Sequence, residues 1–564
     1  MGKAAPGDPI GHKIRPARDR LMAKKREPRR QAAPVAAAGE LRPAGAFFQV
    51  CLTVALLAAY AGFLAHPLEL TTTDLGRYLK NGELFFQRGL IVDSNLFAYT
   101  TPDYPFVNHS WGSGAIYYLV ERSLGFSGLS WFFLLVSVTT LWIFLRLAVR
   151  NGSFALGALC AVIVMPILIT RHEIRPEMFS YLMSGLFLNL LWAYRQGHRD
   201  ARWLMILPLL QLVWVNLHIY FFIGMLLVGI FLLQSLIDLA AQSSSGASSQ
   251  WHPSKVLTVV ALATFAASCI NPAGLRGALY PLFIFQGYGF PVIENYSVPA
   301  ILQAGFQFLP LTFFLIIVGV LFLSWLYVII QDRSRFSLSN FVLSLFFAAL
   351  AWWMIRNFVI FALFALPLTA ANFSTMARAQ SWRWLNSPLG TLATVSGVAV
   401  LLVLINPAFF FAGGRGTFGI GLKEGNLAAL KFFRSEHLKG PIFNTFDVGS
   451  YLTYGLYPRE RVYVDNRPEA YPATFFSEEY FPLLVNEEKW RSHLFTNKFN
   501  IIVVNPSGHS TAAENFVIRR MLDPDWAPVF FDKEVLILAR RFGANQPVIA
   551  KHELPREAVL QKTE

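Results

Sequence analysis

Residues 46–64 of the chain read AFFQVCLTVALLAAYAGFL and contain no charged side chain. A helix of this length and apolar character can cross the hydrocarbon core of a bilayer. No small-residue cleavage site of the kind that ends a signal peptide accompanies the run. We therefore expect it to remain in the protein as its first membrane helix.

Similar apolar runs recur along most of the chain. The 564 residues are 54% hydrophobic and only 15% charged, whereas soluble domains average about 25% charged residues. This composition excludes an ordinary soluble enzyme and a disordered chain. The runs fall at about 45–65, 126–149, 152–170, 177–194, 203–217, 219–239, 255–270, 308–330, 337–355, 357–375 and 389–411. They predict an α-helical polytopic membrane protein with about eleven transmembrane helices.

The charged residues predict an orientation in the membrane. Residues 1–44 hold 11 Lys and Arg against 4 Asp and Glu, which is half of the net charge of +14. A basic tail ahead of a hydrophobic helix is typical of a cytoplasmic segment, and we prefer this interpretation to a nucleic-acid site. With an odd number of helices, the C-terminal part then lies outside the cell (inner) membrane, in the periplasm.

The chain divides into three segments. A basic cytoplasmic tail covers 1–44, a transmembrane domain covers 45–411, and a small extracytoplasmic α/β domain covers 412–564. Two long loops of the transmembrane domain, 66–125 and 271–307, fall on the outer side. In the last segment, helical patterns separate short β-rich runs at 441–443, 461–464, 500–504, 528–531 and 535–539.

The first outer loop contains a carboxylate shortly after the first membrane helix. The segment 71–82 reads TTTDLGRYLKNG and begins an amphipathic helix at Asp74. A carboxylate in this place can act as a general base. It can equally be an N-cap, because Asp at a helix start is common and stabilising. Both interpretations stay open from the residues alone.

A second outer loop, 171–177, is unusually rich in charge for this section of the chain. Arg171 and Arg175 can grip a phosphate, because guanidinium groups are bidentate donors that stay charged. Glu173 and Glu177 can orient these arginines or bind a divalent cation. The alternative is a solvated charged turn, which has no role in chemistry.

Further polar or aromatic residues lie at helix ends or in loops at the same level of the membrane. Such groups are expensive near a bilayer and are usually functional, although any one of them can be a satisfied structural contact. Together they predict one wet cavity open to the outer side. They are His109, Trp111, Asn216, His218, Glu294 and Arg356.

The order of these pieces resembles the GT-C class of membrane glycosyltransferases, of the bacterial mannosyltransferase and oligosaccharyltransferase type. The matching pieces are Asp74-Leu75-Gly76-Arg77-Tyr78, His109-Ser110-Trp111-Gly112, Arg175-Pro176-Glu177-Met178-Phe179-Ser180, Trp214-Val215-Asn216-Leu217-His218 and Asn271-Pro272-Ala273-Gly274. The resemblance implies an inverting, hexosyltransferase-like enzyme. Its donor is a sugar linked to polyprenyl phosphate, its acceptor a lipid, glycan or protein, and Asp74 is its catalytic base.

The C-terminal segment adds to the resemblance. Phe446-Asp447-Val448-Gly449 and the later Asp465-Asn466-Arg467 are similar to segments that help hold the acceptor in oligosaccharyltransferases. Thr445-Phe446 stands where those enzymes have paired tryptophans. Asp447, Asp465 and Arg467 are therefore candidate acceptor-binding residues, together with His109, Trp111, Glu173, Glu177, Asn216, His218 and Glu294. A helix cap is the alternative role for Asp447.

The resemblance leaves metal dependence open. No acidic pair such as Asp-x-Asp stands beside Asp74, so the sequence does not define a metal site. If a divalent cation binds, its candidate ligands are Asp74, Glu173 and Glu177. A metal-free mechanism would use Arg171, Arg175 and Arg356 to neutralise the lipid phosphate as it leaves.

Two alternative functions come from other classes. One is a transporter or flippase for a lipid or anionic solute, but transporters place ionisable groups near the bilayer midplane, often in repeated halves. Here these groups lie at the outer helix ends and no repeat is visible. The other is an inactive scaffold that presents the C-terminal domain.

Overall fold

The computed structural model describes most of the chain in two compact units, 1–50 and 51–564. The predicted basic tail, 1–44, lies almost entirely outside the described residues, so its cytoplasmic location stays a prediction. The described residues are 2, 43–243, 253–284, 288–290, 292–305, 308–411, 418–507 and 510–561.

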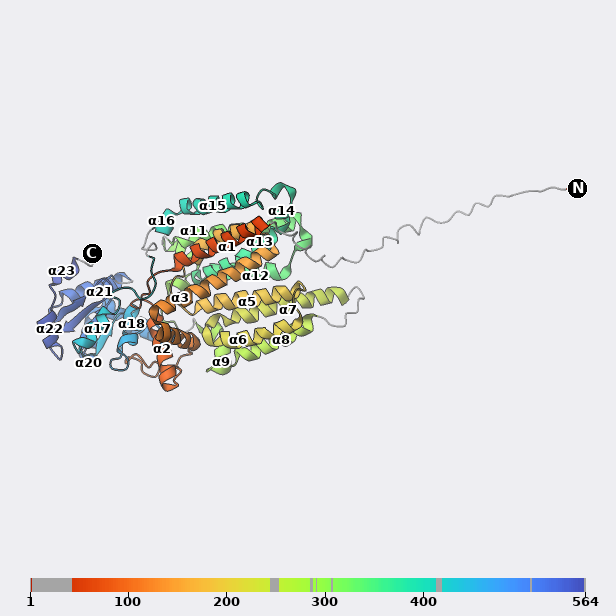
Figure 1. The fold of residues 1–564 in the computed structure, drawn as a ribbon. Helices are drawn as coiled ribbons and strands as arrows, with labels where there is room; N and C mark the ends of the chain where they lie inside the picture. The colour runs from red at the N-terminus through yellow and green to blue at the C-terminus, as the bar shows by residue number, and fades with distance from the viewer. Residues whose placement is uncertain are drawn as a thin grey trace. The chain divides into compact units, whose positions relative to one another are not determined.

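Each of the eleven predicted apolar runs is occupied by a helix. The long helices lie side by side as a bundle in Figure 1, and α13 packs against α3, α4, α11 and α12 near its centre. The helices are α1 (Pro43–Leu64), α3 (Trp111–Asn151), α4 (Phe154–Leu168), α5 (Glu177–Arg195), α6 (Ile206–Leu217), α7 (Phe222–Ser243), α8 (Pro253–Ser268), α11 (Pro310–Gln331), α12 (Leu338–Trp353), α13 (Phe358–Asn372) and α15 (Pro388–Ile405).

The number of membrane crossings stays a prediction. By length and composition, six helices among the described residues can cross a membrane, and four more apolar helices are shorter. The apolar stretch containing α13 is 89% buried inside the protein, whereas that of α15 is 22% buried. Since both are apolar, α13 forms the core of the bundle and α15 presents an apolar surface suited to lipid.

The first outer loop is held tightly against the bundle. Helix α2 (Leu75–Arg88) packs on the start of α3, and a Cβ on Gly82 would lie 2.2 Å from the carbonyl oxygen of Gly114. Helix α3 breaks at Gly125, whose φ of 66° and ψ of −173° suit glycine. The part of α3 that belongs to the first outer loop and the predicted apolar run 126–149 therefore join at this kink.

The second long outer loop, 271–307, contains only short helices among its described residues. They include α9 (Gly274–Leu279), η5 (Ile293–Asn295) and α10 (Val298–Gln303). The backbone amide of Ile355 donates to the carbonyl of Tyr296 at 3.0 Å. This bond ties the loop to the start of α13, beside Arg356.

The strands of the C-terminal part form one four-stranded sheet in the order β1-β2-β4-β3, with β1 and β2 parallel and the other pairs antiparallel. They are β1 (Ile442–Asn444), β2 (Ile501–Val504), β3 (Trp526–Phe531) and β4 (Leu536–Arg540). The predicted run at 461–464 is wrong as a strand: Val462 makes only an isolated bridge to Ala98. This run packs on the first outer loop and does not join the sheet.

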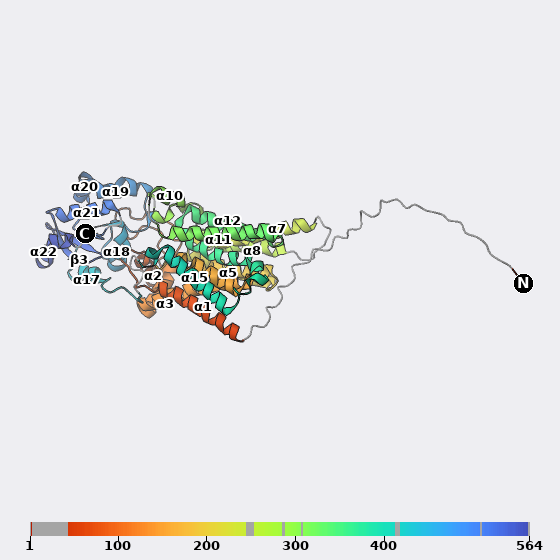
Figure 2. The same ribbon diagram turned by 90° about the horizontal axis from the view of Figure 1, so that it is seen from above.

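The C-terminal part and the helical bundle belong to the same compact unit, 51–564. Helix α18 (Gly449–Leu456) packs directly on α2, and Figure 2 shows these two helices where the sheet meets the bundle. A Cβ on Gly76 would lie 2.7 Å from the carbonyl oxygen of Ser450. The predicted boundary at 412 between two domains stays a prediction.

Candidate active site

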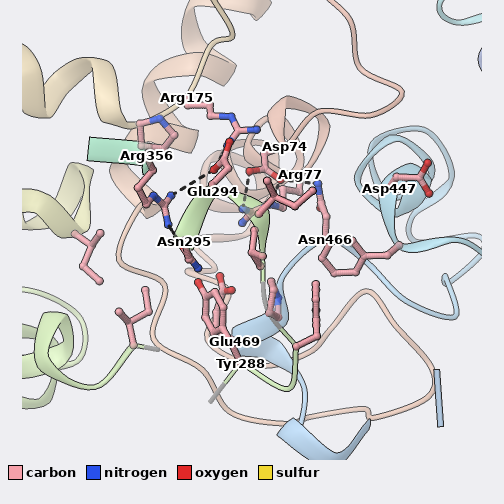
Figure 3. A pocket seen from close by; sticks show the side chains of 18 of the residues that line it. Asp74, Arg77, Arg175, Tyr288, Glu294, Asn295, Arg356, Asp447, Asn466 and Glu469 are labelled. Carbon is pink, nitrogen blue, oxygen red and sulfur yellow. Dashed lines mark hydrogen bonds and ion pairs between the residues drawn. The ribbon is translucent and has the colours of Figure 1, made fainter. Parts of the chain in front are cut away.

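A cavity of about 670 Å³ lies where the helical bundle meets the C-terminal part. Figure 3 shows the polar side chains that line it. Chain segments far apart in sequence supply its wall, among them the start of α2, the loop before α5, the segment containing η5, the start of α13, and the C-terminal residues 445–447 and 466–469. Its charged lining agrees with the cavity expected from the distribution of charge, and its opening to the outer side of the membrane stays a prediction.

Asp74 lines the cavity at the N-cap position of α2, but its side chain makes no capping hydrogen bond. The carboxylate instead pairs with Arg77, Nη2 to Oδ2 at 3.3 Å, and accepts a hydrogen bond from Asn466 Nδ2. The backbone amide of Arg77 donates to Ser450 Oγ at 2.9 Å. The carboxylate is thus held from both sides, and 20% of the side chain remains exposed for a ligand.

Three arginines converge on Glu294, which lies close to Asp74 in the cavity (Figure 3). Arg171 Nη1 lies 2.8 Å from Glu294 Oε1, and Arg175 Nη1 donates to both carboxylate oxygens at 3.1 Å. Arg356 Nη2 lies 3.9 Å from Glu294 Oε2. Burial raises the pKa of Glu294, but the three arginines together lower it further, so the net pKa is well below its usual value.

Glu173 and Glu177 complete the charge balance of this cluster. Arg175 Nε donates to Glu173 Oε2 at 2.8 Å, and Arg356 Nη2 donates to Glu177 Oε1 at 3.2 Å. The cluster therefore has three cations and three anions in a partly buried site. An incoming phosphate would compete with these carboxylates for the guanidinium donors.

Of the three arginines in this cluster, Arg356 is the best placed to bind a ligand. It lines the cavity, and its buried Nε has no hydrogen-bond partner among the described residues. Arg175 lines the cavity as well, whereas Arg171 is absent from the described lining. The structure therefore gathers the three predicted arginines around Glu294, but only two of them face the cavity.

The predicted aromatic and histidine residues divide into two groups. His109 and His218 line the cavity with ring centroids 6.3 Å apart. Burial, followed by the charge of Arg77, lowers the pKa of His109 to about 4, so this ring is neutral at pH 7. Trp111 instead donates to Asn216 at 2.8 Å, which fixes the start of α3 on the end of α6 outside the described cavity lining.

Of the candidate acceptor-binding residues in the C-terminal part, one lines the cavity and two do not. Asp447 lines the cavity in the first turn of η9 (Phe446–Val448), apart from the arginine cluster (Figure 3). Asp465 and Arg467 are 0% exposed and pair with each other, with Arg467 Nε 3.0 Å from Asp465 Oδ1. Arg467 also donates to Asn95 at 3.3 Å. In the structure this pair joins the first outer loop to the C-terminal part and does not face the cavity.

Several cavity residues were missed by the sequence analysis. Arg77 follows Asp74 by one helical turn, a spacing that could have indicated the ion pair. Asn466 and Glu469 flank the Arg467-Pro468 step and face the cavity, while their neighbours Asp465 and Arg467 face inward. In Figure 3, Glu469 lies beside Tyr288 on the wall opposite the arginines.

Burial raises the pKa of Glu469, although Arg77 partly opposes the shift. A carboxyl whose folded-state pKa exceeds its unfolded-state pKa costs stability as the pH rises from the lower to the higher of these two values. We therefore expect Glu469→Gln to raise the unfolding temperature relative to wild type, by a margin that grows as the pH rises above the ordinary pKa of a carboxyl. Thermal unfolding in detergent measures this margin.

Glu553 provides a matched control for this prediction. A hydrogen bond from Arg541 lowers the pKa of Glu553. Glu553→Gln should therefore lower the unfolding temperature relative to wild type, by a margin that grows as the pH rises. If the difference in unfolding temperature between Glu469→Gln and wild type does not change with pH, the raised pKa of Glu469 is contradicted.

The residues proposed for a divalent cation do not form a metal site in the structure. No group of three or more His, Cys, Asp or Glu within the described ranges is placed to hold a metal ion. Asp74 pairs with Arg77, Glu173 with Arg175 and Glu177 with Arg356. Each carboxylate has a cationic partner in the structure, so the predicted divalent cation stays a prediction, and none of the chemical steps below uses one.

The bundle, its outer loops and the C-terminal part together form a GT-C-like fold. No protein-family model and no curated protein matches the chain. Among solved structures, the chain is similar to the oligosaccharyltransferase of Archaeoglobus fulgidus in its apo form, with 12% identity, a TM-score of 0.55, and coverage of 83% of this chain and 71% of that chain.

Two further solved structures share the fold. ArnT from Cupriavidus metallidurans in the apo state is 14% identical with a TM-score of 0.52, and the match covers 90% of this chain and 99% of that chain. The arabinofuranosyltransferase AftD from Mycobacteria is 15% identical with a TM-score of 0.51, covering 88% of this chain and 40% of that chain. The predicted GT-C-like fold is thus confirmed.

Proposed function

We propose that the protein transfers a sugar from a polyprenyl-phosphate-linked donor to an acceptor at the outer face of the membrane. The observation that carries this proposal is a cavity whose lining contains both a held carboxylate, Asp74, and two arginines of a cluster centred on Glu294. The fold supports it: the similar archaeal enzyme AglB, with a TM-score of 0.54, was solved with an inhibitory peptide and a dolichol-phosphate.

The proposed reaction is a displacement at the anomeric carbon. Asp74 accepts the proton of the acceptor nucleophile, whose atom forms the new bond to the anomeric carbon as the bond from that carbon to the phosphate oxygen breaks. The lipid phosphate leaves with the electron pair, and Arg175 and Arg356 stabilise its charge. Attack opposite the leaving group inverts the anomeric carbon, and Arg77 and Asn466 keep Asp74 oriented.

The direct test is transfer by purified protein in lipid vesicles, supplied with labelled polyprenyl-phosphate sugars and an extract of envelope acceptors. The proposal expects label in an acceptor and release of polyprenyl phosphate. Movement of labelled lipid between leaflets without cleavage of the sugar–phosphate bond would favour the transporter or flippase instead. Neither transfer nor movement would favour the scaffold.

The proposal also requires a defined orientation. We infer a multi-pass protein of the inner membrane, with the N-terminus in the cytoplasm and residues 412–564 in the periplasm, because the basic loops then fall inside. A reporter that is active only outside the cytoplasm should work when fused after the last residue, Glu564. Activity of a cytoplasm-only reporter at the same point would contradict this orientation.

A further inference from the structure

A closed hydrogen-bond cluster joins the C-terminal part of the chain to the segment just before Asp74. Asn426 Oδ1 accepts from the backbone amide of Leu70 at 3.0 Å, and Asn426 Nδ2 donates to Thr71 Oγ1 at 2.9 Å. Glu534 Oε2 accepts from Thr71 Oγ1 and from Asn426 Nδ2, each at 2.9 Å. We call the side chains of Thr71, Asn426 and Glu534 the Thr71 clamp.

The Thr71 clamp is shielded from water and its charge is compensated. Thr71 is 0% exposed and Asn426 is 5% exposed. Glu534 lies in the turn between β3 and β4, where it forms an ion pair with Lys423. Lys423 also lies 3.8 Å from Glu69. Buried polar groups with all their partners in place have little freedom to shift, so the clamp is a rigid attachment.

The backbone next to the Thr71 clamp is fixed as well. The amide of Leu68 donates to the carbonyl of Gly421 at 2.7 Å, and the amide of Lys423 donates to the carbonyl of Leu68 at 2.8 Å. The Thr72 hydroxyl then donates to Glu69 Oε1 at 3.2 Å. Residues 68–72 therefore leave the clamp in a fixed direction, which places Asp74 at the start of α2.

None of the three clamp side chains belongs to the described lining of the cavity. The clamp therefore does not contact a ligand in the cavity, and any effect on the reaction passes through Asp74. A displacement of about 1 Å at a reacting group can cost on the order of a hundredfold in rate. An attachment three residues before the catalytic base is close enough to produce such a displacement.

We propose that Glu534 and Asn426 are positioning residues, which fix Leu70 and Thr71 and thereby hold Asp74 in the geometry required for transfer. The proposal rests on the proposed function of the cavity. An apolar contact would bury the same segment, but it would not fix the position of the Leu70 amide and the Thr71 hydroxyl as three directional hydrogen bonds do.

The experiment compares Glu534→Ala with Glu534→Gln in the full-length protein. Alanine removes the acceptor of two bonds, whereas the amide oxygen of glutamine can still accept both. Glu534→Ala should lower kcat by about tenfold to a hundredfold, where kcat is normalised to the number of sites that bind donor. The KM for donor and the binding of polyprenyl phosphate should stay unchanged. Glu534→Gln should retain most of kcat. Thr71→Val and Thr71→Ser form a second pair of this kind.

Amide hydrogen exchange supplies a readout that is independent of activity. In Glu534→Ala, the backbone amides of residues 68–77 should exchange faster, while exchange in β1 and β2 stays as in wild type. Glu553→Ala is the matched control, because Glu553 forms an exposed ion pair with Arg541 in the same part of the chain. It should change neither exchange at 68–77 nor kcat.

The outcomes separate the two proposals. Unchanged exchange at 68–77 in Glu534→Ala overturns the clamp, and so does a loss of kcat that glutamine and alanine share equally. Faster exchange at 68–77 with normal kcat also overturns the positioning role. Faster exchange in Glu534→Ala together with a wild type that transfers no sugar supports the attachment and rejects the proposed function.

Discussion

Asp74→Asn should reduce sugar transfer by about 10²- to 10⁴-fold, the range expected for loss of a positioned general base. Asparagine has the same shape and can still accept the hydrogen bond from Asn466, but it cannot take a proton from the acceptor. The binding of polyprenyl phosphate should change little, because the proposed phosphate ligands, Arg175 and Arg356, pair with Glu173 and Glu177 and not with Asp74. Initial rates with labelled donor and binding of polyprenyl phosphate measure the two effects.

The same substitution also tests the structural alternative. Asparagine is as good an N-cap as aspartate, so a residue that only capped α2 would tolerate the change. Asp93→Asn is the matched control, because Asp93 is an exposed carboxylate in the same loop and is outside the described cavity lining. A folded Asp74→Asn protein with the activity of Asp93→Asn would remove Asp74 from the mechanism.

The membrane helices could be predicted from the sequence because their signal is local. Each apolar run is long enough to indicate a helix by itself, and the structure places a helix in every one. Local signals also have limits. The run at 461–464 has a β-rich composition, yet it does not join the sheet and instead contacts Ala98 of the first outer loop. The sequence does not reveal which partner such a run will find.

The charged wall of the cavity could be predicted because charge is scarce in this part of the chain. Arg175, Glu294 and Arg356 stand out in an apolar sequence, and the structure brings them together. Asn466 could not be found in this way, since its bond to Asp74 spans most of the chain. Asp465 and Arg467 were predicted to bind a ligand but form an internal ion pair. The spacing of an acid two residues from an arginine is the same in both cases, so the sequence does not distinguish them.

Arg356→Ala should lower kcat/KM for the donor by about 10²- to 10³-fold, which is the usual cost of removing one positioned donor to a developing negative charge. The residue lines the cavity with a buried Nε that has no partner among the described residues, so a phosphate oxygen can become its acceptor. Arg356→Lys should recover only part of this loss, because an ammonium group cannot reproduce the bidentate geometry of a guanidinium. Initial rates at varied donor concentration measure the change.

Loss of stability is the competing explanation for such a result. Glu177 is almost fully buried and would lose Arg356 at 3.2 Å, keeping only Arg171 at 3.9 Å, and breaking a buried pair costs up to about 3–5 kcal/mol. The double substitution Arg356→Ala with Glu177→Gln removes both charges and should restore much of the unfolding temperature without restoring donor use. Arg335→Ala is the remote control, since Arg335 bonds Ser374 outside the described cavity lining. Recovery of donor use in the double variant would mean that Arg356 stabilises the fold and does not bind phosphate.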